Sequence, residues 1–171
     1  LFKAASSKLR GYNIPIAAFV GSQEEGTYGP WPVNEGLCTL EAHRTMPIDA
    51  QARHLFATGL VDDVIIANAY ASEEELKALS EVDRDMLTFG IELEPTVSDI
   101  EKEIIFEFKH HVRADMPKYM ARSTMCRLAY ANADIPATNT RDLKRGDIIV
   151  VNNEYGHYKG ELHIILEDMP N

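Results

Sequence analysis

The sequence predicts an α/β fold followed by a small β-rich domain, and three observations support this prediction. Nearly continuous apolar segments at 14–20 and 61–66 are typical of strands buried on both faces of a parallel sheet. Helix-like segments alternate with these two strands, as in strand–helix–strand units. Near the end of the chain, apolar segments at 147–152 and 161–166 flank a glycine-containing turn and predict a hairpin. We therefore expect the terminal units of a parallel α/β barrel, followed by a β-rich domain.

The boundary between the two domains is predicted near residues 82–86, where the character of the sequence changes. We assign 1–85 to the barrel portion and 86–171 to the β-rich domain. The chain begins on Leu1 and enters a helix-like segment, and no earlier segment supplies the other barrel strands. We therefore expect the back end of a larger enzyme, whose N-terminal barrel portion is its first partner.

Two helices are predicted before the second strand. Residues 1–11 are helix-like, and 47–58 has apolar residues at helical spacing. Pro47 suits the first turn of that helix, and Gly59 ends it.

A capping box opens a third helix at Ser72, whose partner is Glu75. Leu76 and Leu79 are expected on the inner face of this helix.

A second capping box, formed by Ser98 and Glu101, opens the first element of the β-rich domain. The apolar residues at 104–108 that follow are compatible with a helix or a strand, and periodicity does not decide between them.

Composition excludes several classes of protein. The net charge of −10 argues against non-specific binding of nucleic acid. No apolar run reaches the roughly 18 residues needed to span a membrane, so no membrane partner is expected. Cys38 and Cys126 match no CxxC spacing, which predicts two free thiols in a reducing compartment.

Positive charge gathers in one segment of this acidic chain. Residues 108–145 contain eight Lys and Arg residues against three Asp residues. This local excess indicates either a focused anion site or a solvated basic face that pairs with acidic residues elsewhere.

The long loop over 21–38 is a candidate functional loop, because loops of this length in compact domains are usually functional or disordered. In a parallel α/β barrel the site lies at the C-terminal ends of the strands, here near Gly21 and Asn68. Glycoside cleavage needs two carboxylates, one as the acid and one as the nucleophile or base. Glu35 is the candidate in this loop, and a solvated surface glutamate is the alternative.

Two further groups of polar residues were considered as binding sites. The adjacent histidines at 110–111 point in different directions on a helix or a strand, so we expect no metal site. Arg113, Arg122 and Arg127 favour recognition of phosphate or carboxylate, because guanidinium groups bind such anions through two parallel hydrogen bonds. The alternative is buried ion pairing to Asp115.

Many ordered motifs of the chain resemble one bacterial family, the 6-phospho-N-acetylmuramidases, once labelled "outer surface protein". The motifs that carry the resemblance are Glu35–Glu41 with His43 and Arg44, Asp62–Ile66, Tyr70–Leu76, His110–Asp115, Arg122–Ser123 with Arg127, Gly146–Asp147 and Asn153–Leu162.

The resemblance implies a TIM-type barrel followed by a cyclophilin-like β-barrel domain, with this chain matching the C-terminal half of the family. It implies a glycoside hydrolase that cleaves a phosphorylated amino-sugar disaccharide containing N-acetylmuramic acid 6-phosphate, in cytoplasmic cell-wall recycling. No metal and no organic cofactor are implied. The alternative is a non-catalytic sugar-phosphate-binding module or a structural lid.

From the residues and the resemblance together, we assign Glu35 as the catalytic candidate. The assigned substrate-binding candidates are Asn68, His43, Arg44, Arg113, Arg122 and Arg127. The chain departs from the expected family pattern at four places, among them Tyr28, where arginine is usual, and Asn68, where aspartate is usual. An asparagine can neither hold a charge nor take a proton, and a tyrosine in place of arginine weakens anion binding.

Overall fold

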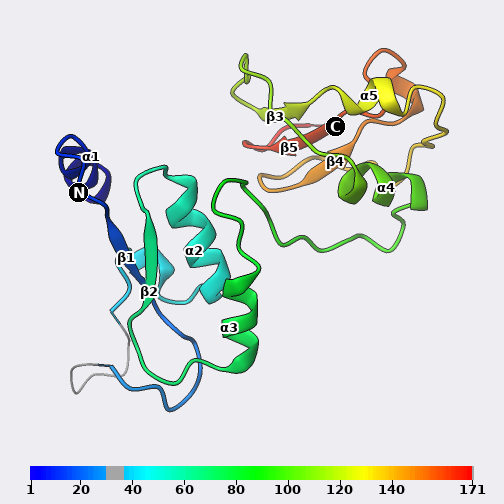
Figure 1. Cartoon of the computed structure of the whole chain (residues 1–171). Helices are drawn as coiled ribbons and strands as arrows, with labels where there is room; N and C mark the ends of the chain where they lie inside the picture. Colours follow the sequence, from blue (N-terminus) through cyan, green and yellow to red (C-terminus); the bar gives the residue numbers. More distant parts are fainter. Residues whose placement is uncertain (30–36, 171) are drawn as a thin grey trace. The chain divides into compact units, whose positions relative to one another are not determined.

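The computed structural model describes residues 1–29 and 37–170 (Figure 1). The chain forms two compact units, Leu1–Ile91 and Glu92–Asn171. The sequence analysis placed the boundary after residue 85, whereas the compact units divide after Ile91.

The N-terminal unit contains a two-stranded parallel sheet with helices beside it (Figure 1). Its elements are α1 (Phe2–Arg10), β1 (Ala17–Val20), the short 3-10 helix η1 (Glu41–His43), α2 (Ile48–Ala57), β2 (Asp63–Ile66) and α3 (Glu73–Ser80). Strands β1 and β2 pair in parallel with Ala17 opposite Asp63, which confirms the predicted parallel pairing.

One face of this sheet is buried and the other is open, within the described part of the unit. Ala18 and Val20 of β1 join the core with Ala52 and Leu55 of α2, whereas Phe19 is 46% exposed. The prediction of strands buried on both faces is therefore wrong for this unit taken by itself. The apolar side chains that a second layer would cover are exposed here.

The predicted helix signals are mostly confirmed. Helix α2 follows Pro47, and Gly59 takes a positive φ of 66° just beyond its end. The capping box at the start of α3 is present. Leu79 packs against the core as expected, but Leu76 is 50% exposed, so its predicted inner position is wrong.

The C-terminal unit contains a three-stranded antiparallel sheet in the order β3-β5-β4 (Figure 1). Its elements are α4 (Asp99–Glu107), β3 (Met120–Ser123), α5 (Cys126–Ala129), β4 (Ile148–Val150), the 3-10 helix η2 (Asn153–Tyr155) and β5 (Leu162–Ile165). The antiparallel pairing of β4 and β5 confirms the predicted hairpin.

The core of this unit forms where α4 packs against the sheet. Ile104 of α4 is fully buried with Cys126, Ile135 and Leu162. The ambiguous segment 104–108 is therefore helical up to Glu107. Both cysteines are free thiols, as predicted.

No helix in the described ranges is both long and apolar enough to cross a membrane. The complete TIM-type barrel and the cyclophilin-like barrel stay predictions, because the described strands form one parallel pair and one antiparallel sheet.

Candidate functional site

The ends of β1 and β2 are joined by one buried side chain, Asn68. Its Oδ1 accepts the backbone N–H of Ser22 at 2.8 Å, and its Nδ2 donates to the carbonyl of Ser22 at 3.1 Å. An amide can accept and donate at once, whereas an ionised carboxylate can only accept. Asn68 thus clamps the loop after β1 to the loop after β2, and both ends of its amide are engaged.

A second buried amide, that of Gln51 on α2, holds the preceding residue of the same loop. Its Oε1 accepts the N–H of Gly21 at 2.8 Å, and its Nε2 donates to the carbonyls of Gly21 and Met46, each at 2.8 Å. Gln51 is fully buried, so these bonds satisfy polar groups that water does not reach.

Glu75 at the start of α3 holds the next two residues. It accepts the hydroxyl of Ser22 at 2.5 Å and the N–H of Gln23 at 2.8 Å. Three side chains from three elements therefore fix three successive residues, 21–23, where β1 ends. Such support is what a site needs to hold its groups in a defined geometry.

A cavity of about 220 Å³ opens beside this loop. The polar and ionisable side chains in its lining belong to Ser22, Gln23, Glu24, Thr27, Cys38, His43 and Arg44. Two predicted binding residues, His43 and Arg44, thus lie at the same cavity. Glu35, the predicted catalytic residue, lies outside the described residues.

His43 is fully buried and forms a 2.8 Å hydrogen bond between its Nε2 and Nδ1 of His54. Burial lowers the pKa of His43, and the neighbouring His54 lowers it further. Its Nδ1 has no hydrogen-bond partner among the residues that the structure describes.

Arg44 holds Glu41 with two hydrogen bonds, from Nε at 2.5 Å and from Nη2 at 2.7 Å. The hydrogen bond from Arg44 lowers the pKa of Glu41. This is the helical ion pair that the three-residue spacing favours.

Two exposed tyrosines form a pair beside the strand ends. Tyr28 and Tyr70 are 69% and 78% exposed, and their ring centroids lie 6.2 Å apart in an edge-to-face arrangement. Tyr28 pairs with Ala69 through two backbone hydrogen bonds of 3.4 and 2.7 Å. Tyr70 has a φ of 69°, a left-handed conformation that is rare outside glycine and is frequent at binding sites. The sequence analysis included Tyr70 in a family motif but did not name it as a site residue, because no local signal marks its backbone conformation.

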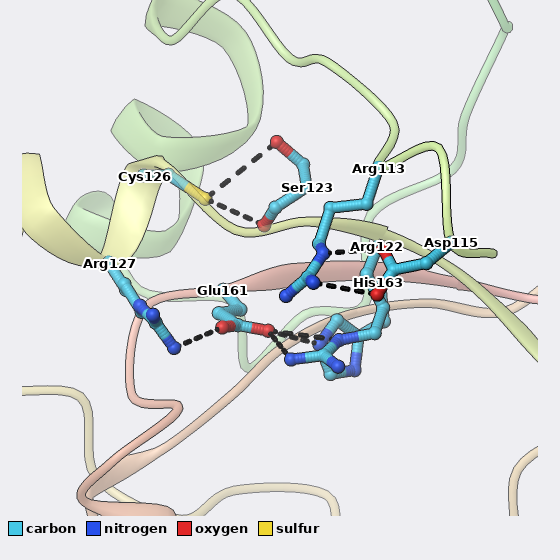
Figure 2. A network of polar contacts seen from close by, with 8 residues as sticks. All are labelled: Arg113, Asp115, Arg122, Ser123, Cys126, Arg127, Glu161 and His163. Carbon is cyan, nitrogen blue, oxygen red and sulfur yellow. Dashed lines mark hydrogen bonds and ion pairs between the residues drawn. The ribbon is translucent and has the colours of Figure 1, made fainter. Parts of the chain in front are cut away.

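The C-terminal unit holds a second polar cluster around Glu161, which is fully buried (Figure 2). Glu161 pairs with Arg122 at 2.6 Å and with Arg127 at 2.9 Å, and His163 lies 3.0 Å from the same carboxylate. Burial would raise the pKa of Glu161, but hydrogen bonds from His163 and Arg122 outweigh burial and keep it below its usual value. Glu161 and His163 were not singled out in the sequence analysis.

A larger cavity, of about 400 Å³, adjoins this cluster. Arg122 and His163 line it, together with Tyr155 and Tyr158. The guanidinium of Arg122 lies 5.2 Å from the ring centroid of Tyr158, within the range of a cation–π contact.

The third predicted arginine, Arg113, pairs with Asp115 at 2.6 Å, and both side chains are substantially exposed. The sequence analysis left open a buried ion pair with Asp115, and the pair forms but is exposed. Six of the eight basic residues of 108–145 form ion pairs with acidic residues.

The adjacent histidines take no part in a metal cluster, and no group of potential ligands suitable for a metal ion occurs among the described residues. The ring of His110 instead lies 2.9 Å from the hydroxyl of Ser123 and 2.9 Å from the carbonyl of Ile104.

Comparison with protein families matches nearly the whole chain. Residues 1–81 match the family model described as "6-phospho-N-acetylmuramidase, N-terminal". Residues 87–171 match the model described as "6-phospho-N-acetylmuramidase, C-terminal". The chain belongs to the 6-phospho-N-acetylmuramidase family. The predicted family is confirmed, with one refinement: the chain matches the models of both domains and not only of the C-terminal half.

Two solved structures resemble this member of the family. An uncharacterized B. cereus protein is 45% identical with a TM-score of 0.91, over 96% of this chain and 47% of that chain. A conserved Enterococcus faecalis protein of unknown function is 27% identical with a TM-score of 0.64, over 99% of this chain and 44% of that one. The chain thus spans less than half the length of either relative. No curated protein matches it.

Proposed function

We propose that the protein is a glycoside hydrolase that cleaves a disaccharide containing N-acetylmuramic acid 6-phosphate, in the recycling of the cell wall in the cytoplasm. The observation that carries the proposal is the match of residues 1–81 and 87–171 to the two domain families. Because the chain spans less than half the length of its solved relatives, the proposal concerns the intact protein.

The ends of β1 and β2 support this function. Gln51, Asn68 and Glu75 hold the loop after β1 from three sides, so groups on that loop meet a substrate in a fixed geometry. The exposed rings of Tyr28 and Tyr70 offer apolar faces against which a sugar ring packs.

The reaction needs one carboxylic acid to protonate the leaving oxygen and one carboxylate to attack or to activate water. Glu35 is the proposed residue of this chain for one of these roles. Asn68 serves neither, because its amide has no acidic proton to give and both ends are bound to Ser22.

The test is release of N-acetylmuramic acid 6-phosphate when the intact protein is incubated with the phosphorylated disaccharide, followed by chromatography. The same disaccharide without phosphate is the control, and we expect it to be cleaved at least tenfold more slowly. No release, or equal release from both, would contradict the proposal.

A matched pair of variants links that activity to the strand ends. Tyr70→Gly removes one ring, and glycine tolerates the positive φ of this position. We expect kcat/KM to fall about tenfold, which corresponds to the loss of about 1.4 kcal/mol of interaction with the transition state. Tyr12→Gly removes a ring that follows α1 and is 69% exposed, against 78% for Tyr70, and this control should leave kcat/KM unchanged.

A further inference from the structure

The 400 Å³ cavity of the C-terminal unit has the size and lining of a small-molecule site. Its volume falls within the range of about 300–1,000 Å³ that is usual for ligand pockets. All its lining residues lie within the Glu92–Asn171 unit, and they come from the three strands and the loops around them. The cavity is therefore formed by the C-terminal unit alone, whereas the strand ends on which the proposed glycosidase function depends belong to the N-terminal unit.

The cavity contains a positively charged donor with spare capacity. Arg122 gives Nε and Nη2 to Glu161, and its Nη1 has no hydrogen-bond partner in the part of the chain that the structure describes. Arg122 and Arg127 together carry two positive charges against the single negative charge of Glu161. This cluster therefore carries one net positive charge, and its member Arg122 lines the cavity, where a partly buried positive charge favours an anion.

His163 supplies a hydrogen-bond acceptor beside that donor. Its Nε2 lies 3.0 Å from Oε2 of Glu161, and an ionised carboxylate can only accept, so Nε2 carries the proton (Figure 2). Burial lowers the pKa of His163 and outweighs the opposite effect of Glu161, and the charge of Arg122 lowers it further, so the neutral ring is favoured at pH 7. Its Nδ1 then presents a lone pair, and no described residue donates to it.

The rest of the lining suits a compact sugar. The rings of Tyr155 and Tyr158 stand partly exposed, while Met120, Ile149 and Val150 provide apolar wall. The cavity thus combines an anion donor, a hydroxyl acceptor and aromatic and apolar surfaces.

We propose that this cavity binds a small anionic sugar, with Nη1 of Arg122 on its phosphate or carboxylate group and Nδ1 of His163 on one of its hydroxyl groups. This site goes beyond the proposed glycosidase function and does not depend on it.

The methionines of the chain allow a site-resolved test on the intact protein. Met120 and Met169 line the cavity, whereas Met46 lies near the end of β1, where its carbonyl accepts from Gln51. In protein labelled with ¹³C-methyl methionine, N-acetylglucosamine 6-phosphate should shift the NMR signals of Met120 and Met169. A shift of Met46 without these two would place binding at the strand ends and overturn the proposal.

Three probes separate the sources of the anionic group. N-acetylglucosamine 6-phosphate offers phosphate, glucuronic acid offers carboxylate, and N-acetylglucosamine has neither. We expect one or both anionic sugars to bind at least tenfold more tightly than the neutral sugar, as judged by titration of the Met120 signal. Equal binding of the neutral sugar would remove the role of Arg122.

Variants with matched controls test the cavity itself. Thr138→Trp places a large side chain at the exposed rim and should abolish the Met120 shift, whereas Thr96→Trp, at an exposed position outside the lining, should preserve it. His163→Gln keeps a donor for Glu161 but removes the Nδ1 acceptor, so affinity should fall about tenfold. If His163→Gln does not fold, Thr138→Trp alone tests the proposal. Binding of the anionic sugar by Thr138→Trp with the affinity of the wild type would overturn it.

The two proposals fail separately. Turnover of the phosphorylated disaccharide without a Met120 shift by any anionic sugar would contradict the cavity site alone. A Met120 shift without turnover would contradict the glycosidase alone.

Discussion

At the scale of single residues, Asn68 stabilises the strand ends through a side-chain donor that an ionised aspartate lacks. The resemblance to the family leads us to expect an aspartate at this position, where a carboxylate would face the carbonyl of Ser22. The asparagine replaces that repulsion with a 3.1 Å hydrogen bond from Nδ2 and keeps the 2.8 Å bond at Oδ1. Asn68 therefore stabilises the strand ends in a way that an ionised aspartate does not.

The substitution Asn68→Asp tests this assignment. At pH 7 the carbonyl of Ser22 loses its donor in a buried position, which costs about 1–3 kcal/mol of unfolding free energy. A protonated aspartate regains a donor, so the difference from wild type should shrink between pH 7 and pH 4. Urea unfolding at both pH values measures it, with the exposed Asn132→Asp as the neutral control. A penalty that grows on acidification would contradict the assignment.

Sequence reasoning reached some residues of the site and not others, for a physical reason. Asn68 and His43 were predicted because they follow strand and loop signals that are local in sequence. Gln51 was missed, and so were the contacts of Glu75 with the loop after β1, since the partners lie 30 and about 53 residues away and only folding brings them together. Glu161 was missed for the same reason, because Arg122 is 39 residues away.

At the scale of elements, the two capping boxes have the same local signature and different surroundings. Ser72 with Glu75 opens α3, and Ser98 with Glu101 opens α4. Both were predicted, because the signal spans only four residues. The signature does not predict that Glu75 also accepts hydrogen bonds from the loop after β1.

The two glutamates therefore form a matched experiment. Glu75→Ala removes a cap and two hydrogen bonds to residues 22–23, whereas Glu101→Ala removes only contacts with Ser98. Because hydrogen bonds to charged groups contribute about 1.5–3 kcal/mol, Glu75→Ala should destabilise its unit by that much more than Glu101→Ala destabilises its own.

Hydrogen exchange gives the same comparison a local readout. The amide of Gln23 should exchange at least tenfold faster in Glu75→Ala and at the wild-type rate in Glu101→Ala. Equal effects of the two variants would mean that Glu75 acts as a cap alone.

Strand limits and helix faces were less predictable than helix starts. The apolar run at 14–20 becomes a strand only from Ala17, and the N–H of Ile16 is taken by the side chain of Asp62 at 2.7 Å. Leu76 has the spacing of an inner residue but is exposed, because α3 is only eight residues long and packs through Leu79. Burial depends on neighbouring elements, and a periodic pattern does not specify them.

At the scale of the whole molecule, each compact unit contains a histidine whose pKa is lowered by burial. His43 lies in the N-terminal unit and His163 in the C-terminal unit, and burial lowers the pKa of both from the usual 6.5. Both units should therefore respond to acid through a buried imidazole, whatever their relative placement.

Acidification should destabilise both units. A histidine with a lowered folded pKa binds fewer protons in the folded than in the unfolded chain, so its contribution is complete above pH 6.5 and is lost as the pH falls through the folded pKa. Glu161, whose pKa lies below 4.5, adds a further loss at lower pH.

Urea titrations at pH 7.5 and 5.5, followed through NMR signals of the buried Leu55 and Ile104, report the two units separately. We expect both midpoints to fall at pH 5.5. In His163→Gln, the urea midpoint reported by Ile104 should fall less between pH 7.5 and pH 5.5, while the fall reported by Leu55 should be unchanged. An undiminished fall of the Ile104 midpoint would show that another group governs the acid response of the C-terminal unit.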